Sequence, residues 1–362
     1  MKNVLVLGSG KIGRMVVNLL QTCGDYQVLA MDSHAASVEE TLALTPGARG
    51  MTGKFDDPAA LDKALEGQWA VVSCAPYYCN MLVAERAKAR GIHYLDLTED
   101  VAVTKKVVQL AKGAKSAFIP QCGLAPGFIT IAANNLIQGM SDLHEVKMRV
   151  GALPEFPSNA LKYNLTWSTE GLINEYIQPC EAVIDGKVAV VPPLEGLEHM
   201  MIEGIELEAF NTSGGLGTFA ATLEGKVKHL SYKTMRYPGH NAILKLLMWD
   251  LGFREHRDEL RKVFERALPT TRQDVVAIFV SAQGHVGRTY TERTYAKLVR
   301  HAHVNGHHWT AIQITTACGV TAVLDLLHEG KLPTHGLVRN EDVNFDDFIA
   351  NRFGRHYAAG EA

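Results

Sequence analysis

The chain opens with MKNVLVLGSGKIGRMVVNLLQTC, residues 1–23, and this stretch predicts the fold. Residues 1–8 are a short apolar run that ends in glycine, which is typical of a buried strand. Residues 11–23 carry apolar side chains at helical spacing. Between them, GSGKIG at residues 8–13 matches the pattern GxGxxG. A strand, a glycine turn and a helix in this order predict a dinucleotide-binding α/β domain.

The three glycines of this turn each meet a physical requirement. Gly8 permits a tight turn, Gly10 lets the backbone approach a pyrophosphate, and Gly13 lets the helix pack closely on the strand. Lys11 and Ile12 open the helix, where free N–H groups and the positive end of the helix dipole favour phosphate. A purely structural glycine turn is the alternative, but the strand and helix on either side favour a bound dinucleotide.

An acidic residue ends the second expected strand, residues 27–31. Asp32 lies 19 residues after Gly13, the spacing of a carboxylate that accepts hydrogen bonds from a ribose diol. Such a carboxylate repels a 2′-phosphate, and Ser33 and His34 follow it in place of an arginine. We therefore expect NAD as the cofactor. NADP is not excluded, because His34 can donate to a phosphate. The alternative for Asp32 is a turn or cap residue.

Length and composition are those of an ordinary globular protein. The 362 residues are enough for two domains, and 47% of them are hydrophobic. With 36 basic and 39 acidic residues the net charge is −3, so no bulk field attracts nucleic acid or anionic lipid. We expect no membrane-spanning stretch and no signal peptide. Six scattered cysteines without a CxxC pair indicate free thiols in a reducing, cytoplasmic compartment.

Strand and helix patterns alternate about every 25 residues up to residue 120. Expected strands cover residues 27–31, 70–74, 94–97 and 117–120, and expected helices cover residues 11–23, 38–44, 56–67, 81–90 and 103–113. Asp56 is expected to cap the helix at 56–67, with Pro58 in its first turn. The alternation predicts a Rossmann-type, doubly wound parallel sheet with helices on both faces.

Ligands of such a sheet bind beyond the carboxyl ends of its strands. The loops at these ends, together with Ser33 and Asp56, supply further expected cofactor contacts: Cys74, Ala75, Pro76, Tyr77, Leu97, Leu124 and Ala125. Loop 122–127, CGLAPG, holds two glycines and a proline that restrict its shape, so it can present backbone groups to a nicotinamide. A plain domain hinge is the alternative. Cys122 is interpreted as a buried thiol rather than a nucleophile, because no base adjoins it.

The pattern changes after Gly127. Residues 146–150, 181–191, 274–282, 289–304 and 307–314 are expected strands, residues 192–225 are expected to be irregular, and residues 315–327 are an apolar helix. Asn305-Gly306 predicts a tight hairpin. We therefore expect three parts. These are a Rossmann domain at 1–123, a mixed α/β domain with an antiparallel sheet at 124–313, and a C-terminal helix and tail at 314–362 that returns to the first domain.

The chain resembles the saccharopine dehydrogenase family, and within it the bacterial and archaeal lysine 6-dehydrogenases. The matching pieces are GSGKIG at 8–13, CAPYYCN at 74–80, GIHYLDLTED at 91–100, CGLAPG at 122–127, NLTWSTEGLINEY at 164–176, EAFNTSGG at 208–215 and KTMRYPGH at 233–240. They are spread over nearly the whole chain, and their combination is specific. Saccharopine reductases tend to have Asp where this loop has Ala125, and the alanine favours the lysine 6-dehydrogenase branch.

The resemblance implies a nicotinamide-dependent oxidoreductase that oxidises or forms a C–N bond of an amino acid. Such a site needs a proton acceptor, a cation for the carboxylate and an acid for an ammonium group. Arg236 suits the carboxylate, His240 suits the base, and Glu99 suits either the ammonium group or the base. A surface ion pair, a core or capping histidine and a helix-start acid are the respective structural alternatives.

Five further residues are expected to bind substrate. Tyr163 and Trp167 line a pocket for an aliphatic chain or belong to the core, and Glu170 is a ligand or a first-turn helix acid. Thr212 and Ser213 are expected to contact the carboxylate or the amine. The histidines at 301, 303, 307 and 308 flank the expected hairpin without cysteine or acidic ligands at a zinc spacing, so we expect no metal.

Three functional hypotheses remain open. The leading one is oxidative deamination of lysine or a close derivative with NAD. The second is reductive coupling of an amine with a carbonyl compound, which forms saccharopine or carboxynorspermidine. The third is a non-catalytic dinucleotide-binding regulator. Because an exposed sheet edge can pair across a two-fold axis, and because the resemblance implies it, we expect a homodimer.

Overall fold

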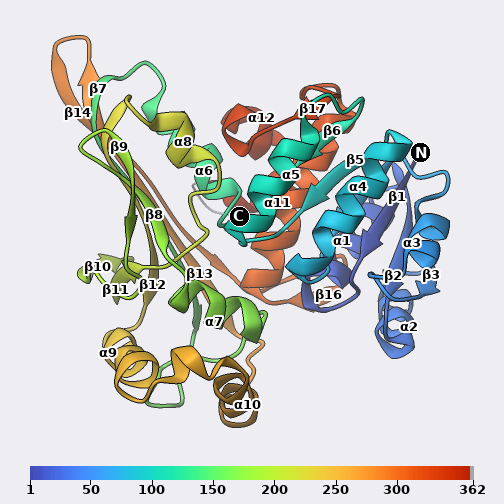
Figure 1. Ribbon diagram of the computed structural model, residues 1–362, viewed down its shortest axis with the longest axis horizontal. Coiled ribbons are helices and arrows are strands. Elements are labelled where there is room, and N and C mark those ends of the chain that lie inside the picture. Colours follow the sequence, from blue (N-terminus) through green and yellow to red (C-terminus); the bar gives the residue numbers. More distant parts are fainter. Residues whose placement is uncertain (359–362) are drawn as a thin grey trace.

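The computed structural model describes residues 1–358 and contains two domains side by side (Figure 1). The first domain is built on a seven-stranded parallel sheet with the order β17-β6-β5-β4-β1-β2-β3. Its strands are β1 (Lys2–Leu7), β2 (Tyr26–Asp32), β3 (Arg49–Thr52), β4 (Ala70–Ser73), β5 (His93–Asp96), β6 (Ala117–Ile119) and β17 (Gly336–Leu337). This order, with β1 between β2 and β4, confirms the predicted doubly wound fold.

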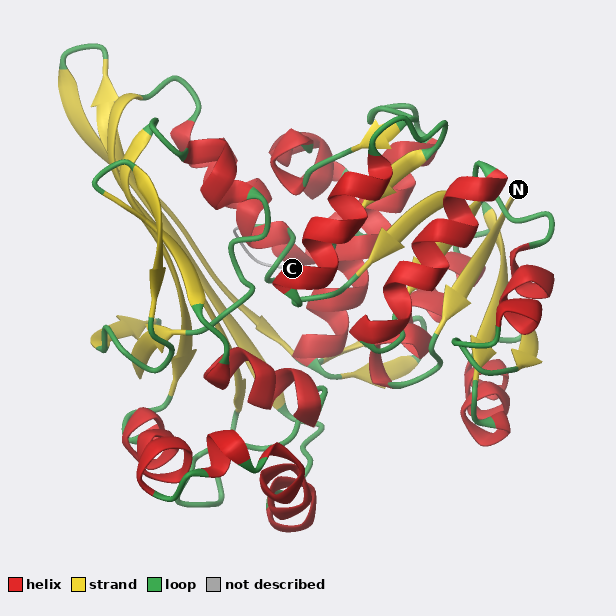
Figure 2. Cartoon of the chain, viewed as in Figure 1, coloured by secondary structure: helices red, strands yellow, loops and turns green. Residues whose placement is uncertain are grey.

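Helices cover both faces of this sheet, as Figure 2 shows. They are α1 (Lys11–Thr22), α2 (Ala35–Leu44), α3 (Pro58–Leu65), α4 (Asn80–Arg90) and α5 (Val101–Ala111). The strands are buried on both sides, so they consist of continuous apolar runs such as Val4–Leu7. The prediction that Asp56 caps α3 is wrong, since the neighbouring Asp57 accepts the N–H of Ala59 at 2.9 Å.

The second domain is built on an eight-stranded mixed sheet with the main order β10-β11-β12-β7-β13-β14. Its strands are β7 (Ser141–Pro154), β8 (Cys180–Ile184), β9 (Lys187–Val191), β10 (Glu198–Ile202), β11 (Ile205–Asn211), β12 (Val227–Arg236), β13 (Asp274–Val286) and β14 (Thr289–Arg300). All pairings are antiparallel except that of β7 with β12. The predicted antiparallel character is therefore confirmed.

The second domain contains five α-helices within the described residues, of which only the start of α7, with Glu170 in its first turn, was anticipated from the sequence. They are α6 (Phe128–Ile137), α7 (Thr169–Ile177), α8 (Phe219–Leu223), α9 (His240–Lys245) and α10 (Arg257–Ala267). Helix α6 packs on β13, β7 and β14, and helix α8 packs on β8. In Figure 2 the opposite face of the sheet points outward without helices. Residues 192–225, expected to be irregular, include β10, β11 and α8.

The segment around the predicted hairpin is shorter than expected. Strands β15 (Ala302–Val304) and β16 (His307–Trp309) form a separate two-stranded sheet around Asn305-Gly306. The expected strand at 307–314 is wrong beyond residue 309. Thr310 caps helix α11 (Ala311–His328) instead, with a capping box to Gln313.

Helix α11 joins the two domains at their shared core. It packs against α1 of the first domain and β13 of the second, while β17 pairs with β6. Among residues 1–358, α11 is the one helix that is long and apolar enough to cross a membrane, so the expectation that no stretch reaches this length and composition is wrong. However, 83% of this helix is buried inside the protein, as in the core helix of a globular domain. Short helix α12 (Phe345–Ala350) follows, and residues 359–362 of the expected third part lie outside the described residues.

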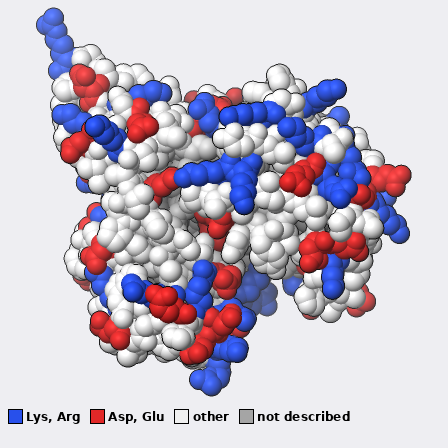
Figure 3. All heavy atoms as spheres, in the orientation of Figure 1, with Lys and Arg blue, Asp and Glu red and all other residues white. Residues whose placement is uncertain are grey.

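Charged side chains of both signs are interspersed over the face shown in Figure 3. The pattern agrees with the nearly balanced composition of 36 basic and 39 acidic residues. The six cysteines are free, four of them buried. The charges of this face therefore build no extended field of one sign.

Candidate active site

A cavity of about 810 Å³ lies between the two domains. The first domain contributes the glycine turn, the loops after β4 and β5, and the loop at 122–127. The second domain contributes residues of α7, β7, β12 and α10. Of the expected site residues, the following line it: Gly10, Lys11, Ile12, Gly13, Cys74, Ala75, Pro76, Tyr77, Leu97, Glu99, Leu124, Ala125, Trp167, Glu170, Ser213 and Arg236. The cavity thus opens at the carboxyl ends of the parallel strands.

The geometry of the glycine turn leaves room for a phosphate group. A Cβ atom at Gly8 would lie 2.7 Å from the carbonyl oxygen of Cys74, and one at Gly13 would lie 1.7 Å from that of Gly8. A Cβ atom at Gly10 would meet nothing within 4 Å. Helix α1 begins there without a side-chain cap, and the hydroxyl of Ser9 is buried without a partner. This turn therefore fits a pyrophosphate at a helix N-terminus.

The carboxylate at the end of β2 lies beside the same turn. Asp32 is buried, and its Oδ2 accepts the N–H of Ser9 at 2.7 Å. Its Oδ1 accepts the N–H of His34 at 2.9 Å. Ser33 and His34 are exposed at this end of the sheet. Asp56, also expected as a cofactor contact, is exposed, and neither it nor Asp32 lines the cavity.

A buried acid holds two of the cavity loops together. Asp96, at the end of β5, accepts the N–H of Thr98 at 3.0 Å and that of Gln121 at 2.9 Å through one oxygen, and the hydroxyl of Tyr94 through the other. These bonds join the loop that carries Glu99 to the loop at 122–127. Burial raises the pKa of the Cys122 thiol, which keeps it protonated as expected of a structural cysteine.

Two carboxyl groups, one from each domain, line the cavity. Glu99 comes from the first domain and Glu175 from α7 of the second, and both line the cavity. Burial raises the pKa of Glu99 to about 7. Burial also raises the pKa of Glu175 to about 7, and the charge of Glu99 adds to this effect while Arg236 opposes it. Both carboxyl groups therefore exchange protons near neutral pH.

Arg236 holds Glu175 in place. Its Nη2 donates to Glu175 Oε1 at 3.0 Å, its Nε to the hydroxyl of Tyr176 at 2.9 Å, and its Nη1 to the carbonyl oxygen of Met235 at 3.0 Å. The guanidinium group also lies 5.0 Å from the centre of the Tyr163 ring, and only 3% of the residue is exposed. The arginine is therefore engaged on all three nitrogens and paired with an acid, whereas it was expected as a free carboxylate anchor.

His240 lies behind this ion pair and outside the cavity lining. Its Nε2 contacts the hydroxyl of Tyr176 at 3.1 Å and its Nδ1 contacts the carbonyl oxygen of Leu161 at 2.9 Å. Burial, with a contribution from Arg236, lowers the pKa of His240 to about 3. The ring is 1% exposed and neutral, so its position disagrees with the expected base that touches substrate. It contacts the hydroxyl of Tyr176, which also accepts a hydrogen bond from Arg236 Nε.

Of the other residues expected to bind substrate, three line the cavity and two lie in the layer of buried side chains behind it. Trp167, Glu170 and Ser213 line the cavity. Tyr163 stands behind the wall, where its hydroxyl accepts the indole N–H of Trp167 at 3.1 Å. Thr212 is also buried behind it, with its hydroxyl 2.7 Å from that of Thr234.

Glycines of the second domain allow close approach to Glu99. A Cβ atom at Gly171 would lie 2.8 Å from Glu99 Oε1, and one at Gly214 would lie 2.5 Å from the backbone oxygen of Glu99. The pieces at 91–100, 164–176 and 208–215 therefore meet at this point. Glu175 was not among the predicted site residues, although an acid among the apolar residues Leu172, Ile173 and Tyr176 was a usable signal. Arg261 and Glu265 of α10, which line the cavity, were not among them either.

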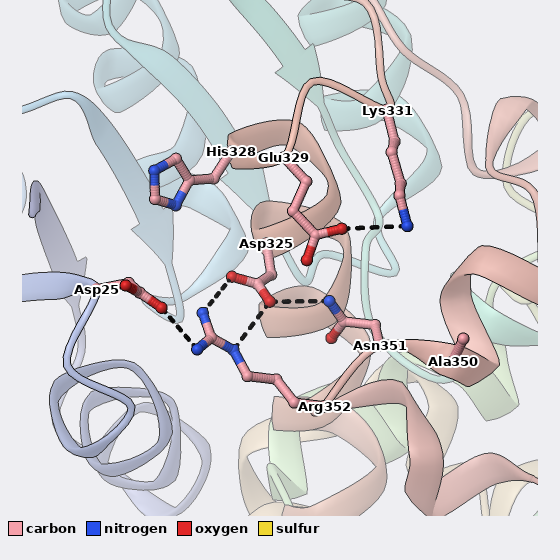
Figure 4. A pocket seen from close by; sticks show the side chains of 8 residues that line it. All are labelled: Asp25, Asp325, His328, Glu329, Lys331, Ala350, Asn351 and Arg352. Atoms are coloured by element: carbon pink, nitrogen blue, oxygen red, sulfur yellow. Dashed lines mark hydrogen bonds and ion pairs between the residues drawn. The ribbon is translucent and has the colours of Figure 1, made fainter.

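A second cavity, of about 390 Å³, lies at the opposite end of α11 (Figure 4). Arg352 bridges Asp325 of α11, at 2.7 Å, and Asp25, at 2.6 Å. Although burial opposes it, hydrogen bonds from Arg352, Tyr26 and Asn351 hold the pKa of Asp325 below its usual value. These contacts tie the C-terminal segment to the first domain, which gives them a structural role.

The fold and the cavity together define the class of protein. A doubly wound domain with a phosphate-binding glycine turn, joined to a second domain across an acid-lined cavity, is the architecture of a nicotinamide dinucleotide-dependent oxidoreductase. Comparisons with known proteins specify the family. The family model for the saccharopine dehydrogenase NADP binding domain matches residues 4–119, and that for the saccharopine dehydrogenase C-terminal domain matches residues 123–355. The chain belongs to the saccharopine dehydrogenase family.

Relatives and solved structures agree with this assignment. The chain is 24% identical over 313 residues to the NADP(+)-linked, L-glutamate-forming saccharopine dehydrogenase of Pyricularia oryzae, which covers 81% of this chain and 67% of that protein. It is 25% identical to the mitochondrial alpha-aminoadipic semialdehyde synthase of Mus musculus over 67% of this chain, but spans only 27% of that protein. The apo saccharopine dehydrogenase of Saccharomyces cerevisiae has the same fold, with a TM-score of 0.79, 17% identity and 96% of each chain covered.

Proposed function

We propose that the protein oxidises the C–N bond of an amino acid, with lysine or a close derivative as the substrate and NAD as the hydride acceptor. The observation that carries the proposal is the pair Glu99 and Glu175, two carboxyl groups that line the cavity and have a pKa of about 7. An ammonium group must lose a proton before its carbon can give up a hydride. A carboxylate that titrates near neutral pH suits this proton transfer.

Glu99 is the proposed general base. It extends from the loop after β5 on the dinucleotide-binding domain, and it lines the cavity together with the glycine turn and the loop at 122–127. Its carboxylate accepts the proton of the substrate ammonium group, which leaves a neutral amine. After hydride loss, a water molecule adds to the resulting iminium carbon and ammonia departs, so the carbon becomes an aldehyde.

Glu175 is the proposed ligand of the substrate ammonium group. Arg236 lies 3.0 Å from its carboxylate and opposes the rise in its pKa, so the arginine favours the ionised form. His240 and Tyr176 in turn hold the arginine. This chain of contacts directs a negative charge into the cavity, which suits a cationic amine.

NAD is the proposed cofactor. Gly10 and the N-terminus of α1 hold the pyrophosphate, and Asp32 accepts hydrogen bonds from the adenosine ribose. Its carboxylate disfavours the 2′-phosphate of NADP, with exposed Ser33 and His34 beside it. A bound oxidised nicotinamide supplies the hydride acceptor. The pairing of the Asp32 carboxylate with the N–H of Ser9 keeps its orientation fixed.

Formation or cleavage of saccharopine is the second candidate function. It is favoured by the names of two curated relatives, at 24% and 25% identity, which are both NADP(+)-linked, L-glutamate-forming saccharopine dehydrogenases. Saccharopine carries more carboxylates than lysine, so it needs additional cations. The described lining contains four glutamates (Glu99, Glu170, Glu175 and Glu265) against three basic residues (Lys11, Arg236 and Arg261), which favours lysine.

The test is initial-rate measurement of NADH formation at alkaline pH with purified protein, NAD and L-lysine. Saccharopine, carboxynorspermidine and NADP are assayed in parallel. Turnover of L-lysine with NAD supports the proposal. If the protein turns over saccharopine but not L-lysine, the proposed substrate is wrong. If it uses NADP but not NAD, the proposed cofactor is wrong. Binding of NAD without turnover of any substrate supports a regulatory protein.

A further inference from the structure

Helix α10 contributes two charged side chains, Arg261 and Glu265, to the cavity wall, in addition to the acid pair Glu99 and Glu175. We infer that Arg261 and Glu265 bind the α-amino acid head group of the substrate, while the amine to be oxidised lies between Glu99 and Glu175. This inference rests on the proposed function and specifies which residues of the cavity hold the other end of the same substrate. Helix α10 lies outside the sequence segments that carry the family resemblance.

The carboxylate of an amino-acid substrate needs a cationic anchor in the cavity. Among the described residues that line the cavity, the lysines and arginines are Lys11, Arg236 and Arg261. Arg236 is engaged on all three nitrogens and paired with Glu175. Lys11 stands on the glycine turn, where its amino group donates to the carbonyl oxygen of Leu165 at 3.3 Å and burial lowers its pKa. Neither is placed to receive a substrate carboxylate.

Arg261 is the remaining cation, and its contacts are easily exchanged. Its Nη1 lies 3.4 Å from Glu265 Oε2, and its Nη2 lies 3.7 Å from Asp258 Oδ1. The partner side chains are 46% and 86% exposed, and that of Arg261 is 36% exposed. Such long, solvated ion pairs contribute little to stability. A substrate carboxylate can therefore replace them with a bidentate contact to the guanidinium group.

Glu265 supplies the complementary charge. It lies one helical turn after Arg261, so both side chains project from the same face of α10 into the cavity. An α-amino acid head group carries a carboxylate and an ammonium group on adjacent atoms. The arginine and the glutamate match these two charges with opposite signs. Loss of either residue should then weaken binding only of ligands that carry the matching group.

The experiment compares L-lysine with two truncated analogues. 1,5-Diaminopentane lacks the carboxylate, and 6-aminohexanoate lacks the α-amine. Arg261→Ala is expected to raise KM for L-lysine about 10–100-fold, the loss of one charge-assisted hydrogen-bonded pair, and to change KM for 1,5-diaminopentane less than twofold. Glu265→Gln is expected to raise KM for L-lysine and to leave that for 6-aminohexanoate unchanged. Arg266→Ala, an exposed arginine of the same helix outside the lining, is the matched control.

The outcomes separate the subsite from the proposed function. Equal effects of Arg261→Ala on L-lysine and 1,5-diaminopentane, or no effect on L-lysine, overturn the subsite. If the wild-type protein does not turn over L-lysine, calorimetric titration of its NADH complex with L-lysine takes the place of kinetics. Binding that is weakened by Arg261→Ala but not by Arg266→Ala supports the subsite even though the proposed oxidation fails. Absence of binding to the wild-type complex overturns it.

Discussion

Replacement of Glu99 by glutamine tests the proposed base most directly. The side chain keeps its size and its place against Gly171, but it can no longer accept a proton. A positioned general base contributes about 10²–10⁴-fold to the rate, so kcat is expected to fall by about that factor. Because Glu99 does not anchor the head group in the proposed arrangement, KM should change much less than kcat.

The rate should also depend on pH, because Glu99 acts as a base only when it is ionised. With a pKa of about 7, Glu99 is about 90% ionised at pH 8 and about 10% ionised at pH 6. The wild-type kcat/KM should therefore fall about tenfold or more as the pH decreases over this range, because the base becomes protonated. The pKa of Glu175 is also about 7, so both groups shape the pH profile of kcat/KM. Glu175→Gln should leave a profile with a single, shallower decrease toward low pH.

The assay is the initial rate of NADH formation from pH 5.5 to 10. Circular dichroism over the same pH range confirms that each variant is folded. Glu170→Gln is the matched control, since Glu170 lines the same cavity but is half-exposed and paired with Arg257 at 3.1 Å. It should leave the midpoint of the profile in place. A Glu99→Gln enzyme that retains more than a tenth of wild-type kcat and the same pH profile would refute the reasoning.

Four further predictions follow from named contacts. Asp32→Gly should lower the preference for NAD over NADP, measured as the ratio of kcat/KM, because it removes the charge that repels a 2′-phosphate; an unchanged ratio would contradict the role of Asp32. Gly171→Ala should lower activity at least tenfold without unfolding the protein, because its Cβ would lie 2.5 Å from Trp167 Cζ3 and 2.8 Å from Glu99 Oε1, both on the cavity wall; wild-type activity would argue against these close contacts. Glu99→Gln should stabilise the protein at pH 8 by about 1–3 kcal/mol, with the gain shrinking as pH falls toward 4.5, since burial raises the folded-state pKa above the unfolded one; urea denaturation at the two pH values measures this. The protein should be a dimer by light scattering, with Val190 and Met201, each 69% exposed at the outer sheet, in the interface; a monomer at micromolar concentration would exclude this assembly.

The first domain could be predicted in detail because its signals are local. The glycine turn, the apolar strand before it and the helix after it are adjacent in sequence, so the periodicities of 2 and 3.6 identify each element. The contacts of Gly8 and Gly13 match the roles expected from GxGxxG. The cap of α3 was predicted at Asp56 and lies at Asp57. This shift of one residue arises because two consecutive acids precede the proline.

The second domain was predicted less well because its strands pair over long separations. Strand β7 lies between β12 and β13, more than 70 residues later in the chain, and helices such as α7 are short and apolar, so periodicity does not distinguish them. The strand expected at 307–314 failed because the capping box at Thr310 redirects the chain into α11.

What the sequence by itself determined is the dinucleotide-binding architecture and the residue types that gather near it, including Glu99 and Arg236. Only the tertiary structure decided what these residues can do. Arg236 meets Glu175 across 61 positions of sequence, and this pairing turns an expected carboxylate anchor into the support of an acid. His240 becomes neutral because it is fully enclosed by Tyr176, Arg236 and Leu161. Charge state depends on burial and on neighbours brought together by folding, and neither is written in local sequence.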